Sequence, residues 1–305
     1  MGSDLPLVIV NPASRGGAGA RDWPSAAMTI RAHFGPFERR FTEASGHASV
    51  LAREEAEHGR RLLLTFGGDG TISETARGIL DSGAPCELGV LPHGTGGDFV
   101  RSLSTPARLA DAARGLRLGH TTRIDVGRVT CFGGESLSFV NAASFGLSAE
   151  VVRRVNQSSK FKGSYARQTI RAALSFDHPD VELSTDGRPP RRVAITTVSL
   201  HNGRFFGGGM KMAPKAELTD GKLAIVIVKK MPPLKLLSRA PLLYWGAHVA
   251  IAEVEQSSLE SLLARPVDPA HEIRLEIDGE SVGRLPARFT IEPAALRVRM
   301  PVTHD

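Results

Sequence analysis

Cysteine and aromatic residues are scarce in this chain of 305 residues, which has two Cys, two Trp and two Tyr. Cys86 and Cys131 cannot form a disulfide framework and show no metal-binding spacing. Reduced thiols and a cytoplasmic location fit this cysteine usage. Aromatic residues make up 6% of the chain, and no Lys/Arg run is interleaved with them, so we predict no nucleic-acid partner.

Long hydrophobic runs are also lacking, and no window approaches the ~18 apolar residues of a membrane span. Residues 1–6 lead directly into a short apolar segment at 7–10, which predicts no signal peptide. The net charge is +6, with a pI of about 9.7. Such a surface is attracted to anionic lipid headgroups. We therefore expect a cytoplasmic protein with transient, peripheral membrane contact, and a homodimer is left open.

The first ~125 residues alternate between apolar segments and helical patterns. Strands are expected at 7–10, 62–66 and 88–91, and helices at 48–57, 72–80 and 106–116. Each strand segment is an uninterrupted run rather than an alternating one, as in parallel strands that are covered on both faces. The sequence therefore predicts an N-terminal open α/β nucleotide-binding domain.

The rest of the chain has a different pattern. Strands are expected at 137–141, 192–198, 223–228 and 272–277, with Asp-Gly turns at 186–187, 220–221 and 278–279. Helices are expected at 160–174 and 234–263, the latter broken near Pro241. This pattern predicts a C-terminal, mainly antiparallel β domain over residues 128–294. The first domain then comprises residues 1–127, with 295–305 returning to it.

A glycine-rich turn follows the second expected strand. Gly67, Gly68, Asp69, Gly70 and Thr71 lie between that strand and the start of a helix. Backbone N–H groups and the positive end of the helix dipole favour a phosphate at such a turn. Asp69 adds a carboxylate suited to Mg²⁺. The alternative is a tight turn with a helix cap.

Two more polar, glycine-rich loops follow strands. One begins at Asn11, and the other contains Gly94, Thr95 and Asp98. Because the carboxyl ends of parallel strands share one edge of a sheet, three such loops together indicate a nucleotide site. The chain has no Walker A sequence, no protein-kinase motif set and no complete Gly-x-Gly-x-x-Gly.

These loops resemble those of a known family. Asn11-Pro12, the 67–71 turn and the 94–99 turn are similar to the catalytic domain of diacylglycerol and sphingosine kinases, especially the bacterial lipid kinases. The order and spacing agree over nearly the whole chain. Gly97 departs from the family pattern, which usually has Asn there. The resemblance implies a diacylglycerol kinase/NAD kinase-like fold and an ATP- and Mg²⁺-dependent lipid kinase.

The resemblance also implies roles for individual residues. Thr42 would contact the nucleotide, and Asp69, Asp98 and Asp125 would form an acidic network around catalytic Mg²⁺. The loop at 213–223 resembles a structural Mg²⁺ site with these ligands: the Asp220 carboxylate and the backbone carbonyls of Glu217 and Lys222. From the spacing alone, a plain Asp-Gly turn is the favoured alternative for that loop.

The segment Asp278-Gly279-Glu280 resembles the family's catalytic segment. A lipid hydroxyl loses its proton as it attacks a phosphate, and a carboxylate is an apt base. We assign Glu280 as the general base, with Asp278 in support. If the strand continued, alternation would place both side chains on the face opposite to the core. The alternative is again an Asp-Gly hairpin turn.

Residues 231–239 and 242–245 combine apolar side chains with Lys235 and Arg239, and they are candidates for the lipid slot and for contact with headgroups. A structural helix is the alternative. The acceptor most in keeping with the resemblance is diacylglycerol, which would yield phosphatidate for phospholipid biosynthesis. An NAD kinase-like or other small-alcohol kinase and a catalytically silent lipid-binding protein remain as alternatives.

Overall fold

The computed structural model describes residues 5–134, 136–157 and 164–302. The chain divides into two compact units. The first consists of Met1–Asp125 with Ala294–Asp305, and the second consists of Val126–Pro293. Each unit has its own hydrophobic core.

The sheet of the first unit is parallel. Its strands are β1 (Leu7–Val10), β2 (Glu38–Phe41), β3 (Leu62–Gly67) and β4 (Glu87–Pro92), in the order β4-β3-β1-β2. Arg297 and Val298, from the long strand β15 (Ala287–Met300), pair in parallel with β4. All residues of β1 and β3 are buried, as predicted for strands covered on both faces.

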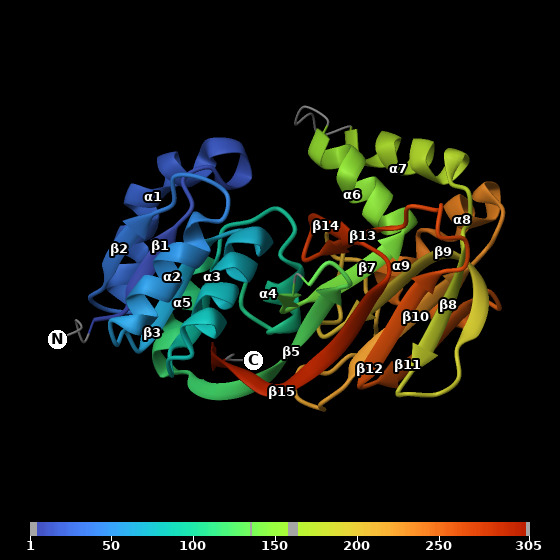
Figure 1. Cartoon of the computed structure of the whole chain (residues 1–305). Coiled ribbons are helices and arrows are strands. Elements are labelled where there is room, and N and C mark those ends of the chain that lie inside the picture. Colours follow the sequence, from blue (N-terminus) through green and yellow to red (C-terminus); the bar gives the residue numbers. More distant parts are fainter. Residues whose placement is uncertain (1–4, 135, 158–163, 303–305) are drawn as a thin grey trace. The chain divides into compact units, whose positions relative to one another are not determined.

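Two pairs of helices and one further short helix accompany this sheet (Figure 1). They are α1 (Ser14–His33), α2 (His47–Glu57), α3 (Asp69–Ser82), the short α4 (Asp98–Ser102) and α5 (Leu109–Leu118). Helix α1 packs with α5, and α2 packs with α3. Trp23 and Ile30 from α1 and Leu116 from α5 join Val8 and Phe66 in one cluster. The structure thus confirms the predicted open α/β fold.

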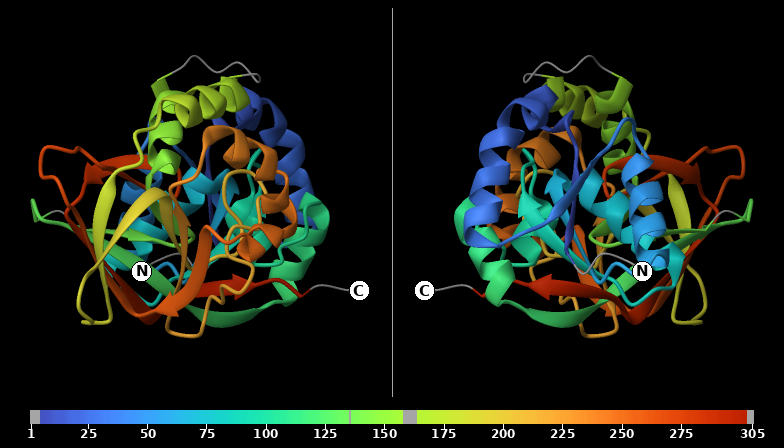
Figure 2. Two further views of the ribbon diagram at one scale, coloured as in Figure 1. Left: turned by 90° about the vertical axis from the view of Figure 1, so that its right-hand side faces the viewer. Right: turned by 90° about the vertical axis from the view of Figure 1, so that its left-hand side faces the viewer.

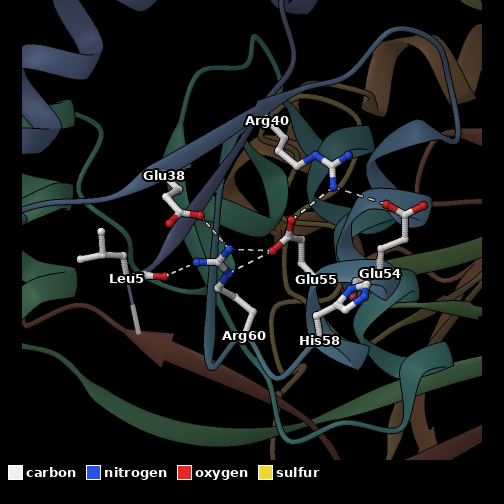
Figure 3. Close-up of polar contacts among 7 residues, drawn as sticks. All are labelled: Leu5, Glu38, Arg40, Glu54, Glu55, His58 and Arg60. Atoms are coloured by element: carbon white, nitrogen blue, oxygen red, sulfur yellow. Dashed lines mark hydrogen bonds and ion pairs between the residues drawn. The ribbon is translucent and has the colours of Figure 1, made fainter. Parts of the chain in front are cut away.

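An ion-pair network ties the edge of this unit together (Figure 3). The Arg60 side chain is only 7% exposed and donates to Glu38 and Glu55, each at 2.8 Å. It also donates to the Leu5 carbonyl at 2.6 Å. Arg40 reaches Glu55 from β2 at 3.2 Å. A buried guanidinium is tolerated only when its charge and N–H groups are paired, so this network joins β2, α2 and the start of β3.

The second unit is antiparallel. Its strands are the second half of β5 (His120–Cys131), β6 (Ser136–Phe139), β7 (Ala142–Gly146), β8 (Asp180–Thr185), β9 (Arg191–His201), β10 (Leu223–Lys229), β11 (Val254–Leu259), β12 (Ser261–Pro266), β13 (Arg274–Ile277), β14 (Glu280–Arg284) and the first half of β15. The first part of β9 pairs with β8, and its second part pairs with β7 and β10. The buried rings of Phe145 and Phe289 stack at 5.8 Å in the core. The predicted antiparallel β domain is confirmed.

Helices α6 (Leu147–Gln157) and α7 (Ser164–Ser175) pack beside α8 (Pro233–Arg239) (Figure 2, left). Leu147, Val151 and Ala172 form a buried cluster, against which Leu236 and Leu237 of α8 pack. Residues 160–163 of the helix expected at 160–174 lie outside the described residues, and α7 forms the rest of it. None of the described helices combines the length and the apolar character that a membrane span requires.

The helix expected over 234–263 is wrong in its second half. Helix α8 is followed by α9 (Leu242–Trp245) and a 3₁₀ turn (Ala247–Ala250), and the chain then forms β11 and β12. Gly246 ends α9 with a left-handed φ of 71°. Strand β11 then pairs with β10 from Val254 to Leu259. The neighbouring strand therefore overrides a helical preference that sequence alone favoured.

Candidate functional site

Three polar loops meet at the carboxyl edge of the first unit's sheet. The Asn11 side-chain amide donates to Thr71 Oγ1 at 2.9 Å, and the Asn11 N–H donates to the Phe66 carbonyl at 3.0 Å. The His93 N–H donates to the Gly67 carbonyl at 3.1 Å. The structure therefore brings the loops after β1, β3 and β4 together.

Close backbone contact explains why residue 94 is a glycine. A Cβ on Gly94 would lie 2.7 Å from the Gly68 Cα, a distance that side-chain carbons do not adopt without a backbone shift. Gly94 thus lets the loops after β3 and β4 touch through their backbones. Gly70 and Thr71 lie in the first turn of α3, where backbone N–H groups are free of intrahelical partners.

Asp69 holds the loop after β4 in place through two hydrogen bonds. It is the first residue of α3, and its carboxylate accepts the Gly97 N–H at 2.7 Å and the Phe99 N–H at 3.2 Å. Gly97 has a left-handed φ of 65°, which glycine adopts without strain and which accounts for glycine at this position. Asp98 between them is buried and lies 3.5 Å from the Arg101 guanidinium. Asp69 and Asp98 thus share one loop system, and Thr95 lies in the same loop.

Thr42 and Asp125 have clear local roles. Thr42 is buried, and its N–H donates to the Val10 carbonyl at 2.9 Å, which places it beside Asn11 at the same sheet edge. Asp125 is buried in β5 and accepts the Ala294 N–H at 2.8 Å. The described residues include no group of three or more His, Cys, Asp or Glu arranged to hold a metal. The three aspartates therefore do not form a ready-made cage, although Mg²⁺ bound with phosphates needs only one or two carboxylates.

Sequence reasoning missed a histidine bridge in this region. His93 Nδ1 lies 2.8 Å from Ser14 Oγ, and His93 Nε2 lies 3.2 Å from Asp22 Oδ2. The imidazole stacks on Phe66 at 4.3 Å. Its hydrogen bond to Asp22 lowers the pKa of that carboxyl. The bridge holds the start of α1 against the loop after β4.

Glu74 was missed as well. It is buried in α3, and its carboxylate accepts the Ala48 N–H at 3.1 Å. The carboxylate accepts a hydrogen bond from an N–H in the first turn of α2 that has no partner within the helix. Its position at the helix start also complements the helix dipole. Because Ala48 lies 26 residues from Glu74, no local sequence pattern points to this cap.

The loop at 213–223 leads into β10 of the second unit. The Asp220 carboxylate accepts the Lys222 N–H at 3.0 Å, and Gly221 has a left-handed φ of 70°. Asp220, Glu217 and Lys222 are exposed. The hydrogen bond and the Gly221 conformation are those of a local Asp-Gly turn, and the magnesium role of this loop stays a prediction.

The Asp-Gly turn expected at 278–279 is confirmed, so the condition for Asp278 and Glu280 to share one strand face is not met. Strand β13 ends at Ile277, and β14 begins at Glu280, which pairs with Ile277. Asp278 and Gly279 form the two-residue hairpin turn between them, with left-handed φ values of 47° and 87°. Side-chain alternation therefore does not pass through this segment, because the chain reverses direction there.

The Asp278 carboxylate holds this turn in place. It accepts N–H groups from Val140 at 3.0 Å, Asn141 at 3.1 Å and Ala142 at 3.0 Å. Val140 and Asn141 form the break between β6 and β7, and Ala142 begins β7, so the strand expected at 137–141 ends at Phe139. The Glu280 side chain is half-buried, directly after the turn.

Glu276, two residues before the turn, was also missed. Its side chain is fully buried in β13, where Ser144 Oγ lies 2.7 Å from one carboxyl oxygen and the Gly279 N–H donates to the other at 3.0 Å. Burial raises the pKa of Glu276 to about 7. In the sequence it is only one polar residue on an alternating strand, so no signal marked it.

An apolar cavity of about 200 Å³ lies within the second unit. Its walls come from α6, β9, β10, α8 and α9. The segments predicted to form a lipid slot supply five of its lining residues: Met231, Leu236, Leu237, Arg239 and Leu243. Polar residues of the lining include Ser148 and Thr197. Leu234 and Trp245, on the same helices, are 80% and 75% exposed.

Comparison with known proteins finds two domain families that match this chain. The diacylglycerol kinase catalytic domain matches residues 6–129, and the YegS C-terminal NAD kinase beta sandwich-like domain matches residues 141–300. A diacylglycerol kinase of Mycobacterium tuberculosis is 28% identical over 300 residues, covering 96% of this chain and 94% of that protein. A diacylglycerol kinase of Staphylococcus carnosus is 27% identical over 252 residues, covering 81% and 79%.

Solved structures extend the likeness to the fold. The crystal structure of a diacylglycerol kinase from Bacillus anthracis str. Sterne has a TM-score of 0.73 and 20% sequence identity, and the match covers 97% of both chains. Together the two domain models span most of the sequence in the expected order. The chain belongs to the diacylglycerol kinase-like family of lipid kinases.

Proposed function

We propose that this enzyme transfers the γ-phosphoryl group of ATP, bound with Mg²⁺, to a lipid hydroxyl, and that it converts diacylglycerol to phosphatidate. The observation that carries the proposal is the junction of the three loops in the first unit. There Asn11 binds Thr71, Gly94 contacts Gly68, and Asp69 holds the loop at 97–99. A phosphate chain fits such a surface of backbone N–H groups at a helix start.

In this proposal the first domain, residues 1–127 with 295–305, binds ATP. Its nucleotide contacts are Asn11, Thr42, Gly67, Gly68, Asp69, Gly70, Thr71, Gly94, Thr95 and Asp98. Asp69, Asp98 and, through water, Asp125 would hold Mg²⁺, which neutralises phosphate charge when bound. The backbone N–H groups and Asn11 orient the phosphates. Catalysis of phosphoryl transfer depends mainly on such positioning and charge neutralisation.

The second domain, residues 128–294, supplies the base. Glu280 accepts the proton of the lipid hydroxyl while its oxygen forms a bond to the γ-phosphorus and the bond from phosphorus to ADP breaks. Asp278 supports Glu280 by fixing the hairpin turn with three hydrogen bonds. Asp220, Glu217 and Lys222 would bind a second, structural Mg²⁺ that stiffens the loop before β10.

The apolar cavity of this domain receives an acyl chain. Exposed Leu234, Tyr244 and Trp245 lie on the helices that line it, and they insert at the membrane surface. Arg239 faces anionic headgroups, whereas Lys235 is engaged by Glu253 at 2.5 Å. The enzyme thus works at the cytoplasmic membrane surface without spanning it.

The test measures phosphate transfer from labelled ATP with Mg²⁺ to three acceptors: diacylglycerol in mixed micelles, sphingosine and NAD. We expect labelled phosphatidate. The substitution Glu280→Gln should lower kcat by about 10²–10⁴-fold, because it removes the base, and should leave the ATP dissociation constant within about twofold. Transfer to NAD alone would establish the NAD kinase-like alternative. ATP binding without transfer to any acceptor would establish a silent lipid-binding protein.

A further inference from the structure

We infer that Glu276 is a positioning residue for Glu280, which it holds in place through the backbone of the hairpin turn. The inference rests on the proposed function of Glu280 as the base. It concerns a side chain that is fully buried in β13.

Two hydrogen bonds connect Glu276 to its surroundings. One carboxyl oxygen accepts the N–H of Gly279, the residue directly before Glu280, at 3.0 Å. The other oxygen lies 2.7 Å from Ser144 Oγ on β7. Asp278 anchors the same turn to the break before β7. The turn is therefore held on both of its residues, and the position of Glu280 depends on both carboxyls.

The hydrogen-bond network around Glu276 suits a neutral acid. Ser144 Oγ lies 2.5 Å from Ser148 Oγ, which lies 2.7 Å from Thr197 Oγ1. Thr197 in turn donates to the Phe145 carbonyl at 3.1 Å. If Glu276 carries a proton, each hydroxyl in this chain receives one hydrogen bond and donates one. A directed chain of this kind leaves no buried donor unsatisfied.

The electrostatic environment also favours the neutral form of Glu276. Burial is the largest influence on Glu276 and disfavours its ionised form, and the nearby Asp278 carboxylate adds to this effect. The hydrogen bonds from Ser144 and Gly279 act in the opposite sense. The groups that β7 and α6 bring to the network are hydroxyls, from Ser144 and Ser148.

The network also reaches the apolar cavity, because Ser148 and Thr197 line its wall. One end of the hydrogen-bond chain is thus at the turn that carries the base, and the other end is at the cavity proposed for the acyl chain. A charge on Glu276 would reverse the hydrogen bond to Ser144 and bring two carboxylates together at the turn. We expect Glu280 to be best placed while Glu276 is neutral.

The experiment compares Glu276→Leu with Glu276→Gln in the whole protein, with diacylglycerol micelles as acceptor. The leucine removes the acceptor for the Gly279 N–H, so kcat at pH 7 should fall at least tenfold with an unchanged KM for ATP. The glutamine keeps that acceptor and donates an N–H to Ser144, so kcat should return to within about threefold of wild type. The ratio of kcat for Glu276→Gln to kcat for wild type should rise between pH 6 and pH 8.5.

Leu262→Ala is the control for loss of stability. Leu262 is fully buried in the same core and has no part in the turn, so this variant should lower Tm but keep kcat. Hydrogen exchange of the Gly279 amide is a readout that does not depend on turnover, and it should accelerate in Glu276→Leu but not in Glu276→Gln. Unchanged kcat and exchange in Glu276→Leu, or a glutamine variant as impaired as the leucine variant, would overturn the inference. A wild-type protein without transfer to any lipid would overturn the proposed function instead, and the exchange comparison would still decide the role of Glu276 at the turn.

Discussion

The two turns that carry the proposed chemistry are built in opposite ways. In the first unit, the turn at Gly67–Thr71 depends on missing side chains, because Gly94 and Gly68 touch through their backbones. In the second unit, the turn before Glu280 depends on the carboxyls of buried Glu276 and half-buried Asp278, which accept hydrogen bonds from backbone N–H groups. The first arrangement leaves N–H groups available for an anion, whereas the second uses them to fix one side chain.

The two turns should therefore be sensitive to different substitutions and conditions. The glycine contact fails when a carbon atom is added, and it should respond little to pH. The carboxyl-held turn tolerates changes of shape that keep its hydrogen bonds, but it responds to the loss of an acceptor and to ionisation. Four experiments, from the largest expected effect to the smallest, test this contrast.

Adding one methyl group should break the first turn. In Gly94→Ala the new Cβ would meet the Gly68 Cα at 2.7 Å, so one backbone must move. We expect a loss of about 4 kcal/mol in the free energy of unfolding and at least a tenfold weaker affinity for ATP, measured by denaturant titration and calorimetry. Gly133→Ala is the matched control, since a Cβ there meets nothing within 4 Å. Equal stability of the two variants would refute the contact.

Removing an acceptor should break the second turn. In Asp278→Ala three backbone N–H groups lose their carboxylate, and we expect a loss of about 3 kcal/mol in the free energy of unfolding together with a lower kcat. Asp278→Asn keeps one oxygen and tolerates the left-handed φ, so its loss should be less than half as large. The affinity for ATP should not change in either variant, and a large change would contradict the separation of roles.

Raising the pH should weaken the second unit through Glu276. Burial raises the pKa of this carboxyl from its ordinary 4.5 to about 7, so the folded state holds the proton more tightly than the unfolded state. This contribution to stability is complete below pH 4.5 and is lost as the pH rises through 7. Between pH 4.5 and pH 8, the free energy of unfolding of wild type should fall by up to about 3 kcal/mol relative to that of Glu276→Gln, measured by urea unfolding. Parallel pH curves for the two proteins would show that Glu276 does not titrate in this range.

In the first unit the side chain of His93 also helps to position the loops, in addition to the glycine contact. His93→Leu removes the contacts to Ser14 and Asp22, and we expect the dissociation constant for ATP to rise by about three- to tenfold, or roughly 1 kcal/mol. Asp22→Asn keeps an oxygen acceptor, so it should change the dissociation constant for ATP by less than about twofold. Isothermal titration of ATP measures both, and equal effects in the two variants would place the bridge outside the nucleotide site.

Much of the fold could be predicted because its signals are local. The strand segments at 7–10 and 62–66, which do not alternate, and the Asp-Gly turns each express their preference within a few residues. The helix expected at 234–263 failed because pairing of β11 with β10 decides the structure of that segment. The face that Glu280 presents could not be predicted by alternation, because the chain reverses direction at the Asp-Gly turn before it.

The sequence by itself determined the two classes of domain, the three glycine-rich loops and the family, because dihedral preferences, apolar periodicity and motif spacing are properties of short segments. Only the tertiary structure decided what each polar group binds. His93 meets Asp22 across 71 residues, and Glu276 meets Ser144 across 132. Such pairs arise when strands and helices pack, and burial then sets their charge, so a one-dimensional pattern carries no sign of them.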